Sequence, residues 1–421
     1  MESSIHTNLN HLFRREYGKL IASLTKTFGT HNLALVEDVV QDTLLKALET
    51  WKLKGIPDNP SAWLFTVARN KALDLIRRQK HQQAFAAQLT PLLKSEYTAA
   101  ATLQEIVKDG NIEDEQLRMM FVCCHPLLAE ETQVALILKT LCGFSIAEIA
   151  SAFLTSEETI SKRLFRGREK FREEKITFDL PVEKELPERL ESVLTAIYLL
   201  FNEGYHATHV AGIIRDDLVE EALRLGNLLR YNTSTDTTAT KALLALMCFH
   251  AARLYQRIDE NGSLLALKDQ DRTKWNHALI VQGHYFLKLA SSGESITAYH
   301  LEAAIAYEYS VAPSYELTNW KQIDELYKSL LKLKPLPLLE FQHTIVKAEC
   351  YGYAQGLDEL LRLEASGLFS RNHFFYTTKG EWLSKLNQKK EAEESLLKAS
   401  ELAHTKAEKN FILKKIVSLG Y

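Results

Sequence analysis

Three adjacent residues with metal-binding or nucleophilic side chains, Cys123, Cys124 and His125, are the first candidates for chemistry in this sequence. Thiolates and imidazoles bind zinc, and an activated thiolate attacks electrophiles. Adjacent cysteines on a helix point in different directions, however, and no further Cys/His ligand pair follows at zinc-finger spacing. We therefore expect both cysteines to be small buried hydrophobic residues, and we predict no metal site and no cofactor.

Acidic and aromatic residues form a second cluster of candidates, at residues 202–206 and 269–272. Glu203 and Asp271 could together supply a general acid and a general base. Such clusters more often form ion-pair or capping networks between helices, and we expect that role here. The sequence has neither a glycine-rich phosphate loop nor a nucleophile elbow, so we predict no catalytic residues and no enzyme. An enzyme that uses the Glu203/Asp271 region remains the alternative.

Basic residues suited to binding phosphate gather at residues 162–172, where six lysines and arginines face one acid, Glu169. Residues 1–94 hold thirteen basic and eight acidic residues, although the whole chain carries a net charge of −3. Binding to nucleic acid requires a local positive surface rather than a positive total charge. The alternative for such a run is a solvated helix face.

The elements around this basic run predict a helix-turn-helix motif. A short helix over residues 144–153 would be followed by a turn at 154–156, where Thr155 caps the next helix and Glu158 completes a capping box. The second helix places Ile160, Leu164, Gly167 and Phe171 on one apolar stripe. Since the second helix of this motif enters the major groove, its outward residues become DNA-binding candidates. The residues near its start suit base edges and the later arginines suit phosphates; together the candidates are Ser156, Thr159, Lys162, Arg163, Arg166 and Arg168.

The first eighty residues contain two further helices with distinct outer faces. In residues 36–48 the apolar stripe leaves Asp38, Gln41 and Asp42 together on an exposed face. Asn59 and Pro60 begin a helix that reaches Arg78. Aromatic and basic groups on one helix suit opened DNA, because bases stack and phosphates pair with cations. The candidates are Trp63, Asn70, Lys71, Arg77 and Arg78, although Trp63 and Phe65 taken alone are expected in the core.

Helical spacing dominates throughout, so the predicted fold class is all-α. We expect a first domain over residues 1–81, a linker over 82–110, a second domain over 111–176 and a third over 181–421. The third resembles tetratricopeptide repeats, with Tyr376, Gly380 and Leu383 on one helix and Ala392, Leu396 and Ala399 on its partner. No stretch approaches a membrane-spanning length and the start is unlike a signal peptide, so we expect a cytoplasmic protein without a membrane partner.

The motifs DVVQD (residues 38–42) and WLFTVARNKALD (63–74) resemble region 2 of sigma factors, and residues 146–172 resemble region 4. The chain is therefore similar to sigma-70 family factors of the extracytoplasmic-function type. This resemblance implies that Asp38, Gln41 and Asp42 dock on core RNA polymerase. It also implies that the helix over 63–78 captures and melts the −10 element, while residues 156–168 read the −35 element of promoter DNA.

Other motifs resemble a subgroup of this family that carries a tetratricopeptide-like C-terminal extension. They are DEQLRMMFVCCHP (114–126), LLFNEGY (199–205), DQDRTKWN (269–276) and YHLEAAI (299–305). We therefore predict a sigma factor whose extension has a regulatory role or binds a further protein partner. The alternative is a DNA-binding repeat protein that regulates transcription without core polymerase.

Overall fold

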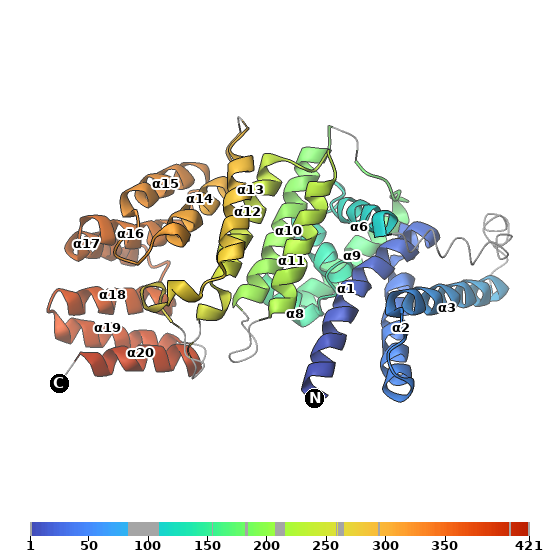
Figure 1. Ribbon diagram of the computed structural model, residues 1–421, viewed down its shortest axis with the longest axis horizontal. Coiled ribbons are helices and arrows are strands. Elements are labelled where there is room, and N and C mark those ends of the chain that lie inside the picture. Colours follow the sequence, from blue (N-terminus) through green and yellow to red (C-terminus); the bar gives the residue numbers. More distant parts are fainter. Residues whose placement is uncertain are drawn as a thin grey trace. The chain divides into compact units, whose positions relative to one another are not determined.

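The computed structural model describes residues 2–82, 109–153, 155–181, 184–206, 215–257, 259, 265–293, 295–403 and 406–419. Most of the predicted linker lies outside these ranges. By internal packing the chain divides into two compact units, Met1–Leu200 and Phe201–Tyr421. Every regular element in the described ranges is a helix, which confirms the all-α prediction (Figure 1).

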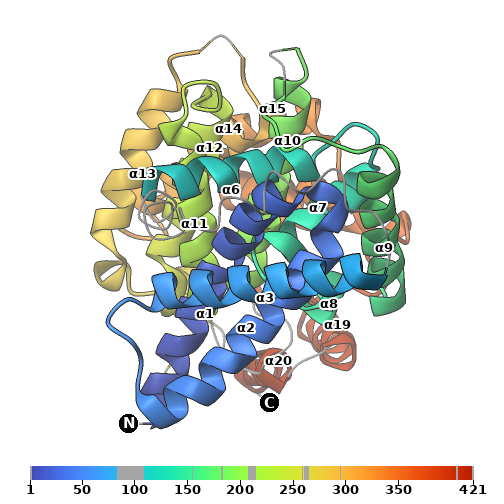
Figure 2. The same cartoon turned by 90° about the vertical axis from the view of Figure 1, so that its right-hand side faces the viewer.

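The first unit holds two groups of helices and the start of α10. We define the first module as α1 (Glu2–Phe28), the 3₁₀ turn η1 (Thr30–Asn32), α2 (Leu33–Lys54) and α3 (Pro60–Gln82). The second module consists of α6 (Asp109–Cys123), α7 (Glu130–Thr140), α8 (Ile146–Ala152) and α9 (Glu157–Glu173). Helix α10 (Leu186–His206) follows. In the first module α1, α2 and α3 pack on one another, as Figure 2 shows.

Local sequence explains how these helices begin and which face they bury. The Asn59 side chain accepts a hydrogen bond of 2.9 Å from the Ala62 amide, so α3 starts at Pro60 as expected. In α2 the expected stripe is buried at Val36, Val40 and Ala47. The exposed face of α2 therefore points away from the core of the first module.

The second unit continues as a series of helices, most of which pack on their neighbours in the sequence. Its elements are α11 (Asp216–Tyr231), α12 (Thr238–Ala252), η3 (Leu254–Arg257), η4 (Leu267–Asp269), η5 (Arg272–Lys274), α13 (His277–Ala290), α14 (Ala298–Val311), α15 (Trp320–Leu333), α16 (Pro337–Tyr351), α17 (Tyr353–Ala365), α18 (His373–Lys385), α19 (Lys389–Leu402) and α20 (Lys406–Ser418).

The helix pair expected near residues 376–399 is present as α18 and α19, with its predicted inward residues buried. Gly380 is the point of closest approach, because a Cβ atom there would lie 2.6 Å from the Leu396 Cγ. The small residue thus lets the two helices pack closely. The pairing fits a helical repeat, while the tetratricopeptide likeness itself stays a prediction.

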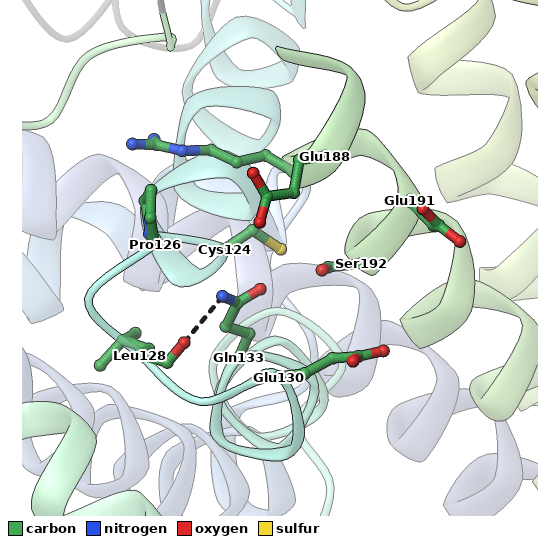
Figure 3. Close-up of a pocket in the computed structure, with 9 residues that line it drawn as sticks. Cys124, Pro126, Leu128, Glu130, Gln133, Glu188, Glu191 and Ser192 are labelled. Carbon is green, nitrogen blue, oxygen red and sulfur yellow. Dashed lines mark hydrogen bonds between the residues drawn. The ribbon is translucent and has the colours of Figure 1, made fainter. Parts of the chain in front are cut away.

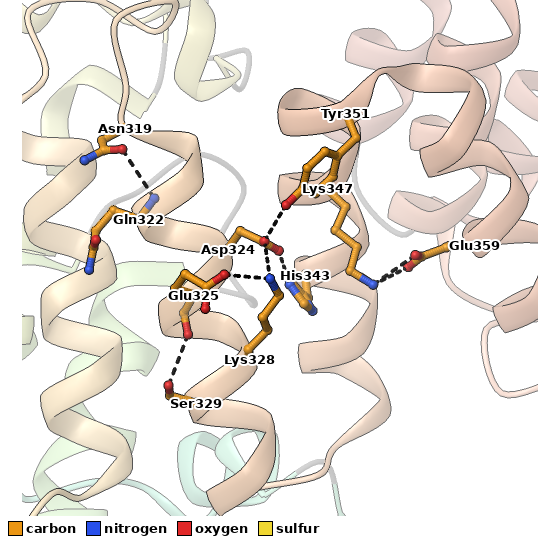
Figure 4. Close-up of polar contacts among 10 residues, drawn as sticks. All are labelled: Asn319, Gln322, Asp324, Glu325, Lys328, Ser329, His343, Lys347, Tyr351 and Glu359. Atoms are coloured by element: carbon orange, nitrogen blue, oxygen red, sulfur yellow. Dashed lines mark hydrogen bonds and ion pairs between the residues drawn. The ribbon is translucent and has the colours of Figure 1, made fainter.

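A buried carboxylate joins α15 to α16 and was not expected from the sequence (Figure 4). Asp324 is 1% exposed and accepts hydrogen bonds from His343 (2.7 Å) and Tyr351 (2.9 Å), besides pairing with Lys328 at 2.7 Å. Burial alone would raise the pKa of Asp324, but the hydrogen bonds from these partners leave it below its ordinary value. The cluster therefore stabilises the helix pair as long as the carboxyl group is ionised.

Replacing Asp324 with alanine is expected to destabilise the second unit by about 2 kcal/mol, since it leaves the buried His343 ring without its hydrogen-bond acceptor. Glu325 is the matched control, because it contacts the same Lys328 at 2.7 Å from a side chain that is 68% exposed. Glu325→Ala should change stability by about 0.5 kcal/mol or less. Urea denaturation followed by circular dichroism measures both values, and equal effects would contradict the assigned role.

Candidate nucleic-acid interface

The N-cap residue of helix α9 lies one position later in the chain than the N-cap predicted from the sequence. Its N-cap is Ser156, whose side chain accepts a hydrogen bond from the Thr159 amide at 3.2 Å. The predicted cap by Thr155 and its capping box with Glu158 are wrong, because Glu158 instead pairs with Lys162 at 2.6 Å. A capping box does occur one helix earlier, between Ser145 and Glu148 at the start of α8.

The apolar stripe of α9 is buried as predicted, and it fixes which face of the helix points outward. Ile160, Leu164, Gly167 and Phe171 are the buried residues of this helix. At Gly167 a Cβ atom would lie 2.9 Å from Leu136 Cδ1, so α9 packs closely on α7. The basic residues are left on the remaining faces of a helix that follows α8 through a short turn, which is the arrangement of a helix-turn-helix motif.

The six DNA-binding candidates of α9 lie on one helix but in different environments. Ser156, Lys162 and Arg166 are exposed, whereas Thr159 is half-buried. The Arg163 guanidinium lies 5.6 Å from the centre of the Phe153 ring, a cation–π contact that holds it at the helix surface. Arg168 pairs with Glu37 of α2 at 2.5 Å. Five candidates therefore lie on the accessible part of α9, and Arg168 is engaged by the first module.

Phe165 is a candidate that the sequence reasoning missed. It lies between Lys162 and Arg166 on α9, and its side chain is 63% exposed. A large apolar side chain in a DNA-facing position can contact the methyl group of thymine. The sequence did indicate this exposure, because Phe165 is a large apolar residue that lies outside the predicted apolar stripe of α9.

The polar face predicted on α2 is present. Asp38, Gln41 and Asp42 are all exposed, on the opposite side from the buried Val36 and Val40. Asp42 pairs with Lys71 of α3 at 2.6 Å, so the two predicted sites of the first module adjoin. The face carries carboxylate and amide groups that suit a basic protein surface.

Among the candidate residues on α3, some pack against neighbouring side chains and others are exposed. Trp63 is half-buried and its ring meets that of Trp51 edge-on, with the centroids 5.4 Å apart. Phe65 is buried, as expected of a core residue, and Asn70 is exposed. Arg77 and Arg78 continue the helix, but their side chains lie outside the described part of the structure.

The cysteine cluster is buried in the second module. Burial raises the pKa of Cys123 to about 12 and that of Cys124 well above its ordinary value, so both thiols stay protonated at neutral pH. This agrees with the prediction of small buried hydrophobic residues. Among the described residues, no group of three His, Cys, Asp or Glu residues could hold a metal ion.

A cavity of about 340 Å³ lies beside these cysteines, between the end of α6, the start of α7 and α10 (Figure 3). Glu130, Glu188 and Glu191 line it, and its one basic residue, Arg189, donates to Glu185 and to the Phe121 carbonyl oxygen. Carboxylates repel phosphates, so this side of the second module is unsuited to DNA. The basic surface of α9 is the better candidate.

The other acidic cluster has structural partners. Asp271 caps η5 through the Thr273 amide at 3.0 Å. Arg272 donates to the carbonyl oxygens of Tyr309 and Ala312, at 2.8 and 2.6 Å. These contacts confirm the expected capping and bridging roles of the two residues.

Comparison with known families supports the same interpretation of the two modules. Residues 13–82 match the family described as Sigma-70 region 2, and residues 118–171 match Sigma-70 region 4. The chain is a sigma-70 family factor of the extracytoplasmic-function type. This sigma factor directs RNA polymerase to promoters. Residues 189–291 match a family of unknown function, DUF6596.

Curated relatives of the sigma factor fall into two groups. An uncharacterized protein of Rhizobium meliloti (strain 1021) is 32% identical over 383 residues, covering 90% of this chain and 89% of that protein. RNA polymerase sigma factor CarQ of Myxococcus xanthus is 29% identical over 142 residues, or 34% of this chain and 75% of CarQ. The ECF RNA polymerase sigma-E factor of Escherichia coli (strain K12) is 27% identical over 135 residues, or 32% of this chain and 70% of its own.

No solved structure gave a significant match to the sigma factor. None of the described helices is both long and apolar enough to cross a membrane. The similarity to CarQ and sigma-E covers about a third of the chain, whereas the similarity to the Rhizobium protein covers nearly all of it. The extension is therefore shared with a relative of similar length.

Proposed function

We propose that the sigma factor divides its work between three surfaces and performs no chemistry of its own. Asp38, Gln41 and Asp42 of α2 dock on core polymerase. Helix α3 holds the opened −10 strand through Trp63, Asn70, Lys71, Arg77 and Arg78. Helix α9 reads the −35 element, with Ser156, Thr159 and Lys162 near base edges and the arginines on phosphates. These roles belong to the two domains predicted from the sequence, residues 1–81 and 111–176. We also propose that the protein acts in the cytoplasm.

The observation that carries this proposal is the outward basic surface of α9. The helix is capped at Ser156 and anchored by a buried stripe, so its orientation is fixed. Lys162 and Arg166 are exposed on it, with Phe165 between them. A fixed helix with cationic and apolar groups on one surface suits the major groove.

Promoter binding by the polymerase–factor complex is expected to weaken steeply with salt, because each phosphate contact releases counterions. Arg166→Ala should reduce the steepness of log affinity against log salt by about one. Fluorescence anisotropy with labelled promoter DNA between low and moderate salt measures this slope. An unchanged slope would remove Arg166 from the phosphate contacts.

We further propose that the extension over residues 181–421 regulates activity or binds another protein. Its support is its length and its stacked helix pairs, which present extended surfaces. Because Arg189 binds the Phe121 carbonyl oxygen in the second module, a truncation should retain the chain up to Leu200. Such a truncated factor is expected to give an altered transcript level with purified polymerase, and an unaltered level would count against the regulatory role.

A further inference from the structure

The cavity between α6, α7 and α10 has no part in the proposed function, because its acidic lining is unsuited to DNA. All the residues that line it belong to the first unit and to the described part of the chain. Its volume of about 340 Å³ lies at the lower end of the range for small-molecule sites, about 300–1,000 Å³. The cavity therefore has the size of a site for a small ligand.

A buried oxygen without a hydrogen-bond partner lies in the wall of this cavity. Gln133 of α7 is 8% exposed, and its amide nitrogen donates to the carbonyl oxygens of His125 (3.1 Å) and Leu128 (3.0 Å). These two bonds fix the orientation of the amide, so its oxygen faces the other way. Figure 3 shows this oxygen turned away from Leu128, toward the side where Cys124 and Ser192 lie. Gln133 Oε1 has no partner among the described residues, and a buried acceptor of this kind indicates a donor from outside the protein.

The charge of the lining indicates which kind of donor the cavity favours. Glu188 and Glu130 are exposed and lie on opposite sides of the Gln133 amide in Figure 3, and a third glutamate also lines the cavity. The one basic residue of the lining, Arg189, pairs with Glu185 at 2.8 Å, so its charge is offset. A buried neutral acceptor is thus surrounded by negative charge, which favours a positively charged donor.

An organic cation suits this lining better than a metal ion does. Among the described residues, no three His, Cys, Asp or Glu side chains form a group that could hold a metal ion, so the carboxylates of the cavity do not converge on one point. A metal such as Mg²⁺ requires oxygen ligands in near-octahedral geometry at about 2.0–2.1 Å. An ammonium or guanidinium group instead carries several N–H donors that bind separate acceptors. The spacing of the acceptors therefore favours an organic cation.

We propose that this cavity binds a small organic cation, whose ammonium or guanidinium group donates to Gln133 Oε1 and lies between the carboxylates of Glu130 and Glu188. Gln133 and Glu130 belong to α7, whereas Glu188 belongs to α10. The bound cation would thus tie the start of α10 to the second module. This inference goes beyond the proposed function, because it requires neither core polymerase nor promoter DNA.

Two classes of small molecule carry such a cationic group, namely amines without a carboxylate and basic amino acids. Arg189 distinguishes them, because it is 7% exposed and its Nε is buried without a hydrogen-bond partner. The carboxylate of an amino acid could accept this hydrogen bond. Agmatine and arginine are the matched probes, since both carry a guanidinium group and only arginine has the carboxylate.

Isothermal titration calorimetry of the full chain with agmatine and with arginine tests the proposal. Binding of either probe supports the cation site, and the tighter of the two identifies the class of ligand. The double variant Glu130→Gln/Glu188→Gln should weaken binding of that probe about fivefold, since each exposed carboxylate contributes modestly. Both side chains are exposed, so the fold should persist.

Glu131→Gln is the matched control for this double variant. Glu131 is also exposed and lies in the same first turn of α7 as Glu130, but it does not line the cavity. The two acids therefore interact similarly with the helix dipole and differ in their distance from the cavity. Glu131→Gln should change the affinity by less than about twofold.

A second variant blocks the cavity and leaves its charge unchanged. Ser192 of α10 is 9% exposed and lines the cavity, so Ser192→Leu places a larger side chain in the space for the ligand. Binding should fall at least tenfold, with the helical circular dichroism signal unchanged. Hydrogen exchange in the wild-type chain locates the site independently, since the bound probe should slow exchange at residues 130–133 and 188–192.

Three results would overturn the cation site. The first is no binding of either probe at millimolar concentration, in which case water alone satisfies Gln133. The second is an equal loss of affinity in Glu131→Gln and in the double variant, which would indicate general attraction to an acidic surface. The third is abolition of probe binding by Mg²⁺ at constant ionic strength, which would indicate a metal site. None of these results bears on promoter recognition, which is tested with polymerase and DNA.

Discussion

Replacing Asp38 and Gln41 together with alanine is expected to lower the affinity of the sigma factor for core polymerase about a hundredfold. Both side chains are exposed on α2, while the stripe that holds this helix in the core is left intact. Each of the two lost interface residues is expected to cost about 1.4 kcal/mol of binding free energy, and together these losses correspond to about a hundredfold in affinity. Competition binding to purified core polymerase measures it.

Asp42 is left unchanged in this experiment because it pairs with Lys71, a predicted DNA contact, and its loss would affect two surfaces. The control is Glu49→Ala, an exposed acid about two turns beyond Asp42 on the same helix and outside the predicted set of docking residues. Thermal unfolding should be the same for all three proteins. Wild-type affinity in the double variant would place the docking surface elsewhere.

Replacing Arg163 and Arg166 with alanine is expected to reduce promoter binding and run-off transcription about a hundredfold, while core-polymerase binding stays unchanged. Each arginine lost from a base or phosphate contact costs about 1–3 kcal/mol. The fold should persist, because Ile160, Leu164 and Phe171 keep α9 anchored. Gel-shift assays of the polymerase–factor complex on a promoter fragment measure the loss.

Arg172 provides the control for this double variant. Its guanidinium is bound by Glu169 on the same helix, so it is already neutralised locally. Arg172→Ala should therefore change promoter binding by about twofold at most. If the control and the double variant behave alike, the basic surface of α9 acts only through its total charge.

Much of the fold could be predicted from the sequence because its signals are local. The buried stripe of α9 and the Asn59 cap of α3 follow from side chains within a few residues of one another. The α18–α19 pair follows from two such local stripes on successive helices. The cap of α9 shows the limit of such signals. Thr155 and Ser156 are both suitable capping residues, and only the three-dimensional turn selects Ser156.

Contacts between distant segments could not be predicted in this way. Glu37 follows Val36 on α2, and nothing near it in the sequence indicates that it is buried against Arg168. Arg168 had the same local pattern as the other arginines of α9 and was assigned to DNA alone. Asp324 likewise gains its role from His343 and Tyr351 on the next helix. In each case the partner comes from a different element.

We conclude that this chain confers promoter specificity on RNA polymerase. In vitro transcription of a genomic fragment pool by purified core polymerase, with and without the factor, tests it most directly. We predict a set of new transcripts whose start sites share two upstream sequence elements and that disappear with Arg163→Ala/Arg166→Ala. A transcript profile that is unchanged by the factor, together with no association between the factor and core polymerase, would contradict the claim.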